Sequence, residues 1–118
     1  MATGYPPDAP TEITIIADAR TASITYNRIT YYGGYSLGSI TFYARYRVNA
    51  GEAPDADCHN CYLRSYGTES SVQLTRLLVG TAYYVQIVTS NEAGQNASQW
   101  KIFTTRGKMF LNQALDIA

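Results

Sequence analysis

The stretch 71–98, SVQLTRLLVGTAYYVQIVTSNEAGQNAS, contains two runs in which apolar and polar residues alternate. Strict alternation places every second side chain on the same face, which is the pattern of a half-buried β-strand. Gly80 separates the two runs, and the turn-forming sequence NEAGQN at 91–96 follows the second run. The stretch therefore predicts two strands and a turn, with the inward positions Val72, Leu74, Leu77, Tyr83, Val85 and Ile87.

The remaining sequence predicts five further short strands. Three of them, at 12–17, 21–27 and 40–48, are β-branched or alternating, and the last covers SQWKIFTT at 98–105. A short edge strand is expected before Gly67. In the run 40–48, alternation predicts the inward set Ile40, Phe42, Ala44, Tyr46 and Val48 and the outward set Thr41, Tyr43, Arg45 and Arg47.

About seven short strands with no helical segment between them predict an all-β fold, a seven-stranded antiparallel sandwich. Residues 1–9, which are rich in proline, are expected to form an extended lead-in or linker, and residues 10–105 to form the domain. The tail 106–118 carries apolar residues at helical spacing. It is either a short helix docked on this domain or a second copy, or a loose end, or the start of a neighbouring module.

The segment 71–98 resembles the second half of a fibronectin type III domain. The matching positions are Leu77, Gly80, Thr81, Tyr83, Val85, Ile87, Asn91 and Gly94. The resemblance extends over residues 7–105, and it implies two sheets of three and four strands in Greek-key order. It also implies a tyrosine corner, in which the Tyr83 hydroxyl bonds to the chain near Leu77 or Leu78. Tyr26 stands where the family usually has tryptophan, so its hydroxyl must find a partner inside a thinner core.

The composition argues against several classes of ligand. Nine basic and nine acidic residues give a formal net charge of zero, so no long-range field attracts nucleic acid or an anionic membrane. No window approaches the roughly 18 to 20 unbroken apolar residues of a membrane span. No dinucleotide-binding or phosphate-binding glycine motif occurs. We therefore expect no nucleic-acid partner, no membrane contact by this segment and no cofactor.

The side chains that carry catalysis are sparse. His59 is the only histidine, and it lies between Cys58 and Cys61 in the sequence DCHNC. A zinc site needs about four ligands, and no second pair of Cys or His exists, so no metal site is expected. In an oxidising compartment Cys58 and Cys61 are expected to form a disulfide that closes a tight loop; in a reducing one they are free thiols. Asp55 and Asp57 lie in a turn-rich loop where acids are usually solvated, so we expect no enzyme.

Two surface features have both a functional and an ordinary interpretation. The sequence NAS makes Asn96 an N-glycosylation acceptor if the chain is secreted from a eukaryotic cell. On the outward face of 40–48, Arg45 and Arg47 flank Tyr43, a combination that is enriched at interfaces. The alternative is a solvated sheet face on which neighbouring side chains stack.

The loop TYYGGYSLGS at 30–39 lies between two predicted strands, and its tyrosines are not required for the core. Tyrosine and glycine together supply large contact area on an adaptable backbone, as in antibody loops. The loop at 91–96 is expected at the same end of the sandwich. The predicted binding residues are Tyr31, Tyr32, Tyr35, Asn91, Glu92 and Gln95, with the alternative that the tyrosines fold back and cover this end of the sandwich.

These observations favour a non-catalytic interaction or adhesion module that binds a protein partner through loops at one end of the sandwich. It is expected at the cell surface or outside the cell, as part of a longer chain whose secretion signal lies elsewhere, because the first residues have no such signal. The alternative is a structural spacer, or an accessory domain of a multidomain enzyme, with no ligand of its own. Fold alone does not choose between them, because function belongs to sites placed on a fold.

Overall fold

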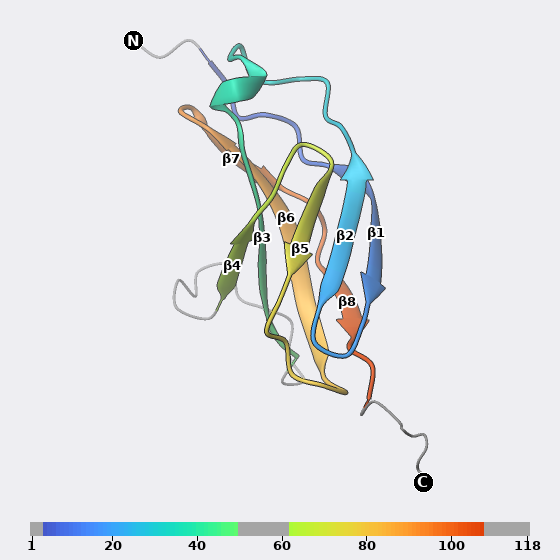
Figure 1. Ribbon diagram of the computed structural model, residues 1–118. Coiled ribbons are helices and arrows are strands. Elements are labelled where there is room, and N and C mark those ends of the chain that lie inside the picture. Colours follow the sequence, from blue (N-terminus) through green and yellow to red (C-terminus); the bar gives the residue numbers. More distant parts are fainter. Residues whose placement is uncertain (1–3, 50–61, 108–118) are drawn as a thin grey trace, which may run out of the picture.

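The computed structural model describes residues 4–49 and 62–107, which form two antiparallel β-sheets packed face to face (Figure 1). The strands are β1 (Thr11–Ala17), β2 (Ala22–Asn27), β3 (Thr41–Val48), β4 (Leu63–Tyr66), β5 (Ser71–Leu74), β6 (Ala82–Asn91), β7 (Gly94–Ala97) and β8 (Lys101–Thr104), and a short 3-10 helix, η1 (Leu37–Ser39), precedes β3. One sheet has the order β1-β2-β5. The other has the order β4-β3-β6-β7, and β8 also pairs with β6. The predicted antiparallel sandwich is confirmed.

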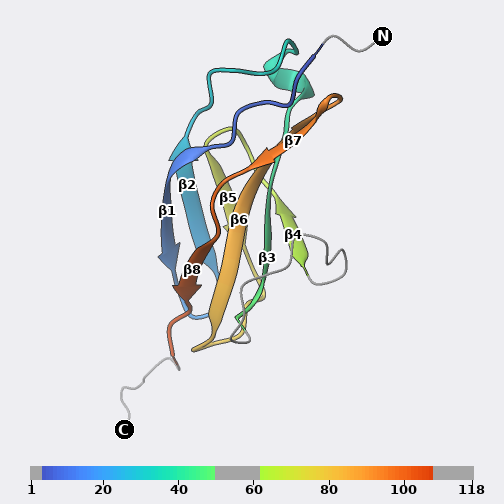
Figure 2. The same cartoon turned by 180° about the vertical axis from the view of Figure 1, so that it is seen from behind.

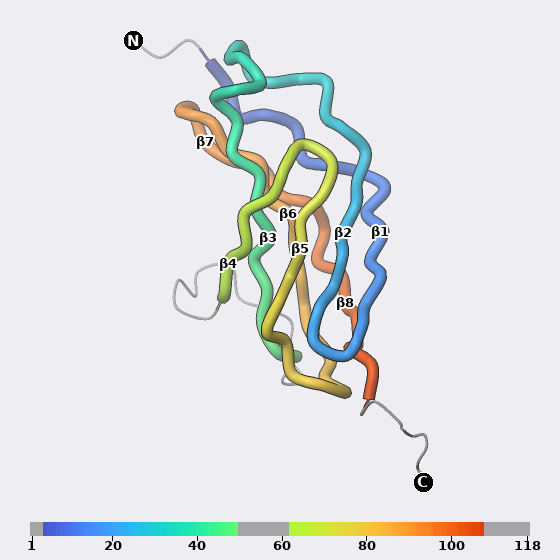
Figure 3. Tube along the Cα trace, in the orientation of Figure 1, coloured from blue at the N-terminus to red at the C-terminus, as the bar shows by residue number. Residues whose placement is uncertain are grey.

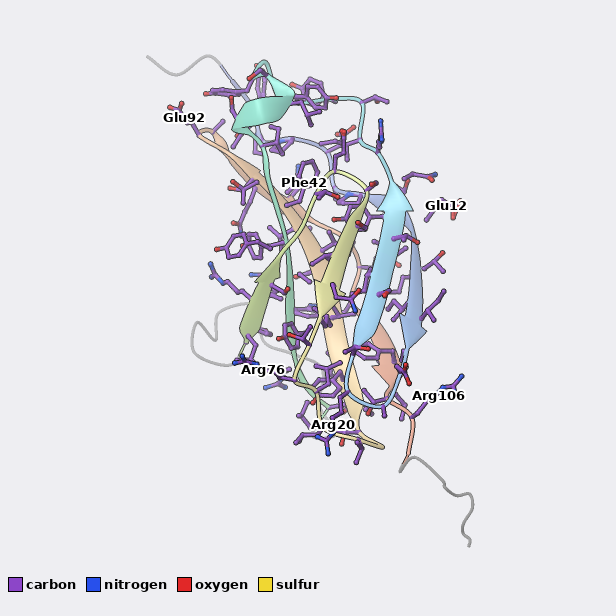
Figure 4. The ribbon with its side chains drawn as sticks, viewed as in Figure 1. Glu12, Arg20, Phe42, Arg76, Glu92 and Arg106 are labelled. Atoms are coloured by element: carbon purple, nitrogen blue, oxygen red, sulfur yellow. The ribbon has the colours of Figure 1, made fainter. Side chains whose placement is uncertain are left out.

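The core lies between the sheets and follows the alternation of the sequence. In β2 the inward residues Ala22, Ile24 and Tyr26 are buried, while the residues between them are exposed. Ile24 pairs with Val72 across to β5, and both are buried. From the other sheet, β3 and β6 contribute the buried residues Phe42, Ala44, Tyr46, Tyr83, Val85 and Ile87. Phe42 is labelled in Figure 4.

The described residues form eight strands rather than seven, in sheets of three and five rather than three and four, because β7 lies in residues that were predicted as a turn. Just after β7, the hydroxyl of Ser98 accepts the backbone N–H of Ile87 at 3.0 Å and donates to the carbonyl of Gln99. A side chain thus replaces one rung of the ladder, and the last predicted strand, 98–105, is reduced to Lys101–Thr104. Sequence 91–96, predicted as a turn, is mostly hairpin, because β6 runs to Asn91 and β7 begins at Gly94.

Two residues of β3 do not follow the predicted faces. Val48, expected inside, is 41% exposed at the end of the strand. Tyr43, expected outside, is only 5% exposed. The rings of Tyr43 and Tyr66 lie 5.4 Å apart, and the guanidinium of Arg64 lies 5.1 Å from the centre of the Tyr43 ring. Side chains of β4 therefore cover the outward face of β3 at this point.

Residue 4 and residue 107, the two ends of the described chain, lie at opposite ends of the sandwich (Figures 1 and 3). The β2–β3 connection and the β6–β7 hairpin are at the first end. The β1–β2 turn, the β5–β6 connection and the residues after β8 are at the second end.

Candidate interaction surface at the loop end

The candidate surface, called the loop end below, consists of residues 28–40 between β2 and β3, the β6–β7 hairpin and the N-terminal residues 4–10. Figure 2 shows these N-terminal residues, called the strap, crossing this end before the chain enters β1. The sequence assigns residues up to 9 to a linker. In the structure Pro7 and Pro10 are buried, so the strap is packed onto the domain.

Backbone hydrogen bonds join the strap to the loop that carries the tyrosines. The N–H of Tyr5 donates to the carbonyl of Gly33 at 2.9 Å, and the N–H of Asp8 donates to the carbonyl of Tyr31 at 3.1 Å. Gly33 has φ of +77°, and a Cβ at this position would lie 1.8 Å from the Tyr5 carbonyl oxygen. Only glycine fits this backbone conformation next to the strap.

Side chains of the hairpin hold the strap from its other side. The amide nitrogen of Asn91 donates to the carbonyls of Tyr5 at 2.7 Å and Tyr32 at 3.0 Å. The amide nitrogen of Asn96 donates to the carbonyl of Pro7 at 2.8 Å, and the hydroxyl of Thr89 donates to the carbonyl of Asp8 at 2.7 Å. The strap therefore ties the loop to the hairpin and gives the loop end a defined shape.

The three loop tyrosines have different environments. Tyr32 and Tyr35 are half-buried and pack against the core, as the covering alternative expects. Tyr31 is 45% exposed. Tyr5, which sequence reasoning placed in a linker and did not single out, is 65% exposed at the same end. No local sequence signal identifies Tyr5, because its position depends on a hydrogen bond to a residue 86 positions away.

The predicted binding residues of the hairpin also divide into one with a structural role and two that are exposed. Asn91 serves the structure, because its side chain holds the strap and its oxygen accepts the N–H groups of Ala93 and Gly94 to form the turn. Glu92 and Gln95 are exposed. The Gln95 side-chain oxygen accepts the hydroxyl of Tyr43 at 3.3 Å. Glycosylation of Asn96 stays a prediction; the residue is exposed while its amide nitrogen is bonded to the strap.

At the opposite end, the Tyr83 hydroxyl accepts the backbone N–H of Leu78 at 2.8 Å, where the resemblance places the tyrosine corner. Tyr83 is 3% exposed, and its ring stacks on Phe103 with centroids 5.5 Å apart. This contact fixes the connection between β5 and β6.

The outward face of the five-stranded sheet carries a stacked cluster, the arginine cluster, made of Arg45, Tyr62, Tyr84 and Trp100. The guanidinium of Arg45 lies 5.6 Å from the ring centre of Tyr62 and 5.8 Å from that of Trp100, and these two rings stack 5.4 Å apart. The Arg45 Nε donates to the side-chain oxygen of Gln86 at 2.8 Å. The sequence indicated Arg45 on this face but not its partners, because they come from three other segments. Arg45 is thus engaged within the domain.

Two buried phenols have shifted acidity. Burial raises the pKa of Tyr26 to about 12, and its hydroxyl donates to the carbonyl of Thr68 at 2.7 Å, which supplies the partner that the sequence required. Burial and the nearby Tyr83 hydroxyl raise the pKa of Tyr46. Both phenols keep their protons at neutral pH, and they belong to the core.

Other sites in the described part of the chain offer little chemistry. A pocket of about 430 Å³ lies where β1 begins beside the β7–β8 break, lined by residues that include Pro10, Glu12, Gln99 and Lys101. Residues 4–49 and 62–107 contain no group of three His, Cys, Asp or Glu side chains that could hold a metal. Within the same ranges no helix is long and apolar enough to span a membrane. The predicted disulfide of Cys58 and Cys61 lies outside the described residues, as do His59, Asp55 and Asp57.

Comparisons with known proteins agree on the fold. No protein-family model matches the sequence, and no curated protein matches it. Among solved structures, the FN1–FN3 domains of chicken CNTN1 match with a TM-score of 0.66 and 22% identity, over 86% of this chain and 33% of that chain. The fn3 domain of human contactin 1 matches with a TM-score of 0.69 and 22% identity, over 92% and 85% of the two chains. The third fibronectin III domain of human KIAA0343 protein matches with a TM-score of 0.70 and 15% identity, over 91% of this chain and 88% of that chain. The chain spans about a third of the CNTN1 fragment.

Proposed function

Since the chain adopts the fibronectin type III fold, we propose that it is a non-catalytic interaction module of a larger extracellular or cell-surface protein. It binds a protein partner through the loop end. The observation that supports this proposal is the pair of exposed tyrosines, Tyr5 and Tyr31, on a backbone that the strap holds in one shape. A rigid backbone lowers the entropy lost on binding, and tyrosine adds contact area with few rotatable bonds.

The surface around these tyrosines has the composition of a protein interface. Leu37 is 36% exposed nearby in η1, and Glu92 and Gln95 of the hairpin are exposed at the same end. Aromatic anchors surrounded by polar groups are typical of interaction surfaces. Tyr32 and Tyr35 support the loop from below and do not reach the partner.

The proposal is tested on the whole chain with an array of purified extracellular domains. Tyr5→Ser combined with Tyr31→Ser should abolish a binding signal that the unaltered chain gives. Tyr66→Ser is the matched control, because Tyr66 is 64% exposed but lies on β4, outside the loop end. Binding that the Tyr5/Tyr31 variant retains, or no binding by the unaltered chain, would refute the proposal.

A spacer or accessory domain is the second candidate function. The described chain begins and ends at opposite ends of the sandwich. This arrangement favours a spacer, because modules connected through their two ends form a line. In that case neither the Tyr5/Tyr31 variant nor the control changes any binding signal, and neighbouring modules in the longer chain contact the two ends.

A further inference from the structure

The described residues at the two ends of the sandwich carry opposite charge. The loop end has two carboxylates, Asp8 and Glu92, and one guanidinium, Arg28, which pairs at 3.9 Å with Glu69 of the β4–β5 connection. Among the described residues of the second end, Arg20, Arg76 and Arg106 are basic and Asp18 is acidic; Figure 4 labels the three arginines. Glu92 and the three arginines lie at opposite ends in this view.

The three arginines, called the arginine end, are brought together by hydrogen bonds between their loops. The N–H of Leu77, next to Arg76, donates to the carbonyl of Arg20 at 3.0 Å. The N–H of Arg106 donates to the carbonyl of Asp18 at 3.0 Å, and the N–H of Gly80 donates to the carbonyl of Arg106 at 2.7 Å. These bonds use the backbone only. All three arginines are exposed, and within the described residues their side chains make no hydrogen bond or ion pair.

The arginine end also exposes an apolar side chain. Leu78, whose N–H is held by the Tyr83 hydroxyl, is 57% exposed beside the arginines. An apolar contact within a charged rim is the usual arrangement of an interface. The loop end offers the matching groups, namely carboxylates for guanidinium pairs and the exposed rings of Tyr5 and Tyr31 for cation–π contacts.

We propose that the arginine end of one copy of this chain docks on the loop end of a second copy. The inference rests on the loop end being a binding surface and identifies its partner class as a copy of the same module. Charge complementarity selects this orientation, because loop end against loop end, or arginine end against arginine end, brings like charges together. A contact between two different surfaces leaves one of each free, so copies add head to tail into a row.

The side of the molecule also has basic residues, and they fit this role less well. The guanidinium of Arg45 lies near the rings of both Tyr62 and Trp100 and bonds Gln86, and that of Arg64 lies over Tyr43. These two groups already have partners within the domain, whereas the three side chains of the arginine end make none within the described residues.

Sedimentation velocity of the whole chain tests the proposal. The unaltered chain should associate as its concentration rises at low salt, and high salt should reverse the association. A loop-end variant, Asp8→Lys with Glu92→Lys, should lower the association constant by about tenfold or more. An arginine-end variant, Arg20→Glu with Arg106→Glu, should do the same. Mixing the two variants should restore pairs, because the native arginine end of the loop-end variant then meets the native loop end of the arginine-end variant, and their two reversed ends are again opposite in charge.

The matched control is Arg64→Glu with Lys101→Glu, which changes the net charge as much as the arginine-end variant but on the side of the sandwich, and it should associate like the unaltered chain. If circular dichroism shows that a variant is unfolded, a variant with neutral Asn or Gln residues at the same positions is used in its place. A monomer at every concentration, equal loss in the control, or no recovery on mixing would overturn the docking. Each of these outcomes would overturn the docking alone. The proposed function would still hold if the unaltered chain bound one of the purified extracellular domains through Tyr5 and Tyr31.

Discussion

Tyr83 stabilises the fold through its hydroxyl group as well as its ring. The buried oxygen accepts the N–H of Leu78 at 2.8 Å, and no other bond to this N–H is present in the described chain. Tyr83→Phe leaves that N–H unsatisfied while keeping the ring stacked on Phe103. We expect a loss of about 1 to 2 kcal/mol in the free energy of unfolding, measured by urea denaturation.

The neighbouring Tyr84 is the control for this change. It is half-buried, its ring contacts Trp100, and its hydroxyl makes no hydrogen bond within the described residues. Tyr84→Phe should therefore change stability by less than about 0.5 kcal/mol. Equal losses at the two positions would contradict the role of the Tyr83 hydroxyl.

Because of Tyr26, the free energy of unfolding should decrease at alkaline pH. Because burial raises the pKa of Tyr26 to about 12, the folded chain keeps this proton where the unfolded chain, with a phenol pKa near 10, has lost it. The stabilisation is complete below pH 10 and is lost as the pH rises toward 12, with a total of about 2 kcal/mol. Tyr46, whose pKa is raised in the same direction, adds to the effect.

The measurement is urea denaturation of the unaltered chain and of Tyr26→Phe at several values between about pH 9 and pH 11.5. The variant starts less stable, since the carbonyl of Thr68 loses its donor, but its stability should fall less steeply over this range. Parallel curves for the two proteins would show that Tyr26 does not titrate as described.

Among the structural elements, the strap depends on one glycine. A Cβ on Gly33 would collide with the carbonyl of Tyr5, and its φ of +77° is unfavourable for any other residue. Gly33→Ala should therefore displace the strap and lower the free energy of unfolding by about 1 to 3 kcal/mol. Hydrogen exchange should show faster exchange of the Tyr5 and Asp8 amides.

Gly38 in η1 gives the matched control for the strap, because nothing lies within 4 Å of a Cβ placed there and its φ is not in the left-handed region. Gly38→Ala should leave both amides protected. If Gly33→Ala also leaves them protected, the strap is not held by its contact with the loop.

The arginine cluster joins β3 to β6 and to the segment between β7 and β8. Arg45→Lys keeps the charge but removes the Nε donor to Gln86 and the planar group that contacts Tyr62 and Trp100. We expect a loss of about 1 kcal/mol in stability. The fluorescence of Trp100, the only tryptophan, should change with it, since its ring faces Arg45.

Arg64→Lys serves as the comparison. Arg64 is exposed and its guanidinium lies over the ring of Tyr43, so the cost should be a few tenths of a kcal/mol and the Trp100 spectrum should stay as in the unaltered chain. A Trp100 spectrum that responds equally to both changes would argue against the cluster as a unit.

For the whole molecule, the sequence predicted what depends on local alternation. The inward residues of β2, β3 and β6 are apolar at every second position, so their faces, and hence the sandwich, could be read from neighbouring residues. The exceptions depend on distant partners. Tyr43 is covered by Arg64 and Tyr66 of another strand, and the break between β7 and β8 depends on the Ser98 hydroxyl.

The candidate site was predictable only in part for the same reason. Tyrosine and glycine in one loop indicated a surface, and Tyr31 is exposed there. The composition of the loop did not show that Tyr32 and Tyr35 turn toward the core, or that Asn91 and Asn96 hold residues near the beginning of the chain. Those contacts join residues more than 50 positions apart, beyond the reach of any local pattern.

The strap has a mechanical consequence. If residue 4 and residue 107 are pulled apart, the load enters one end of the sandwich through hydrogen bonds that Asn91, Asn96 and Thr89 make to the strap. These bonds can break one after another while both sheets stay intact. The first yield would lengthen the chain only by the difference between the contour length of the seven strap residues, at most about 25 Å, and the distance that they already span. The domain would thus absorb a small extension reversibly before its sheets begin to separate.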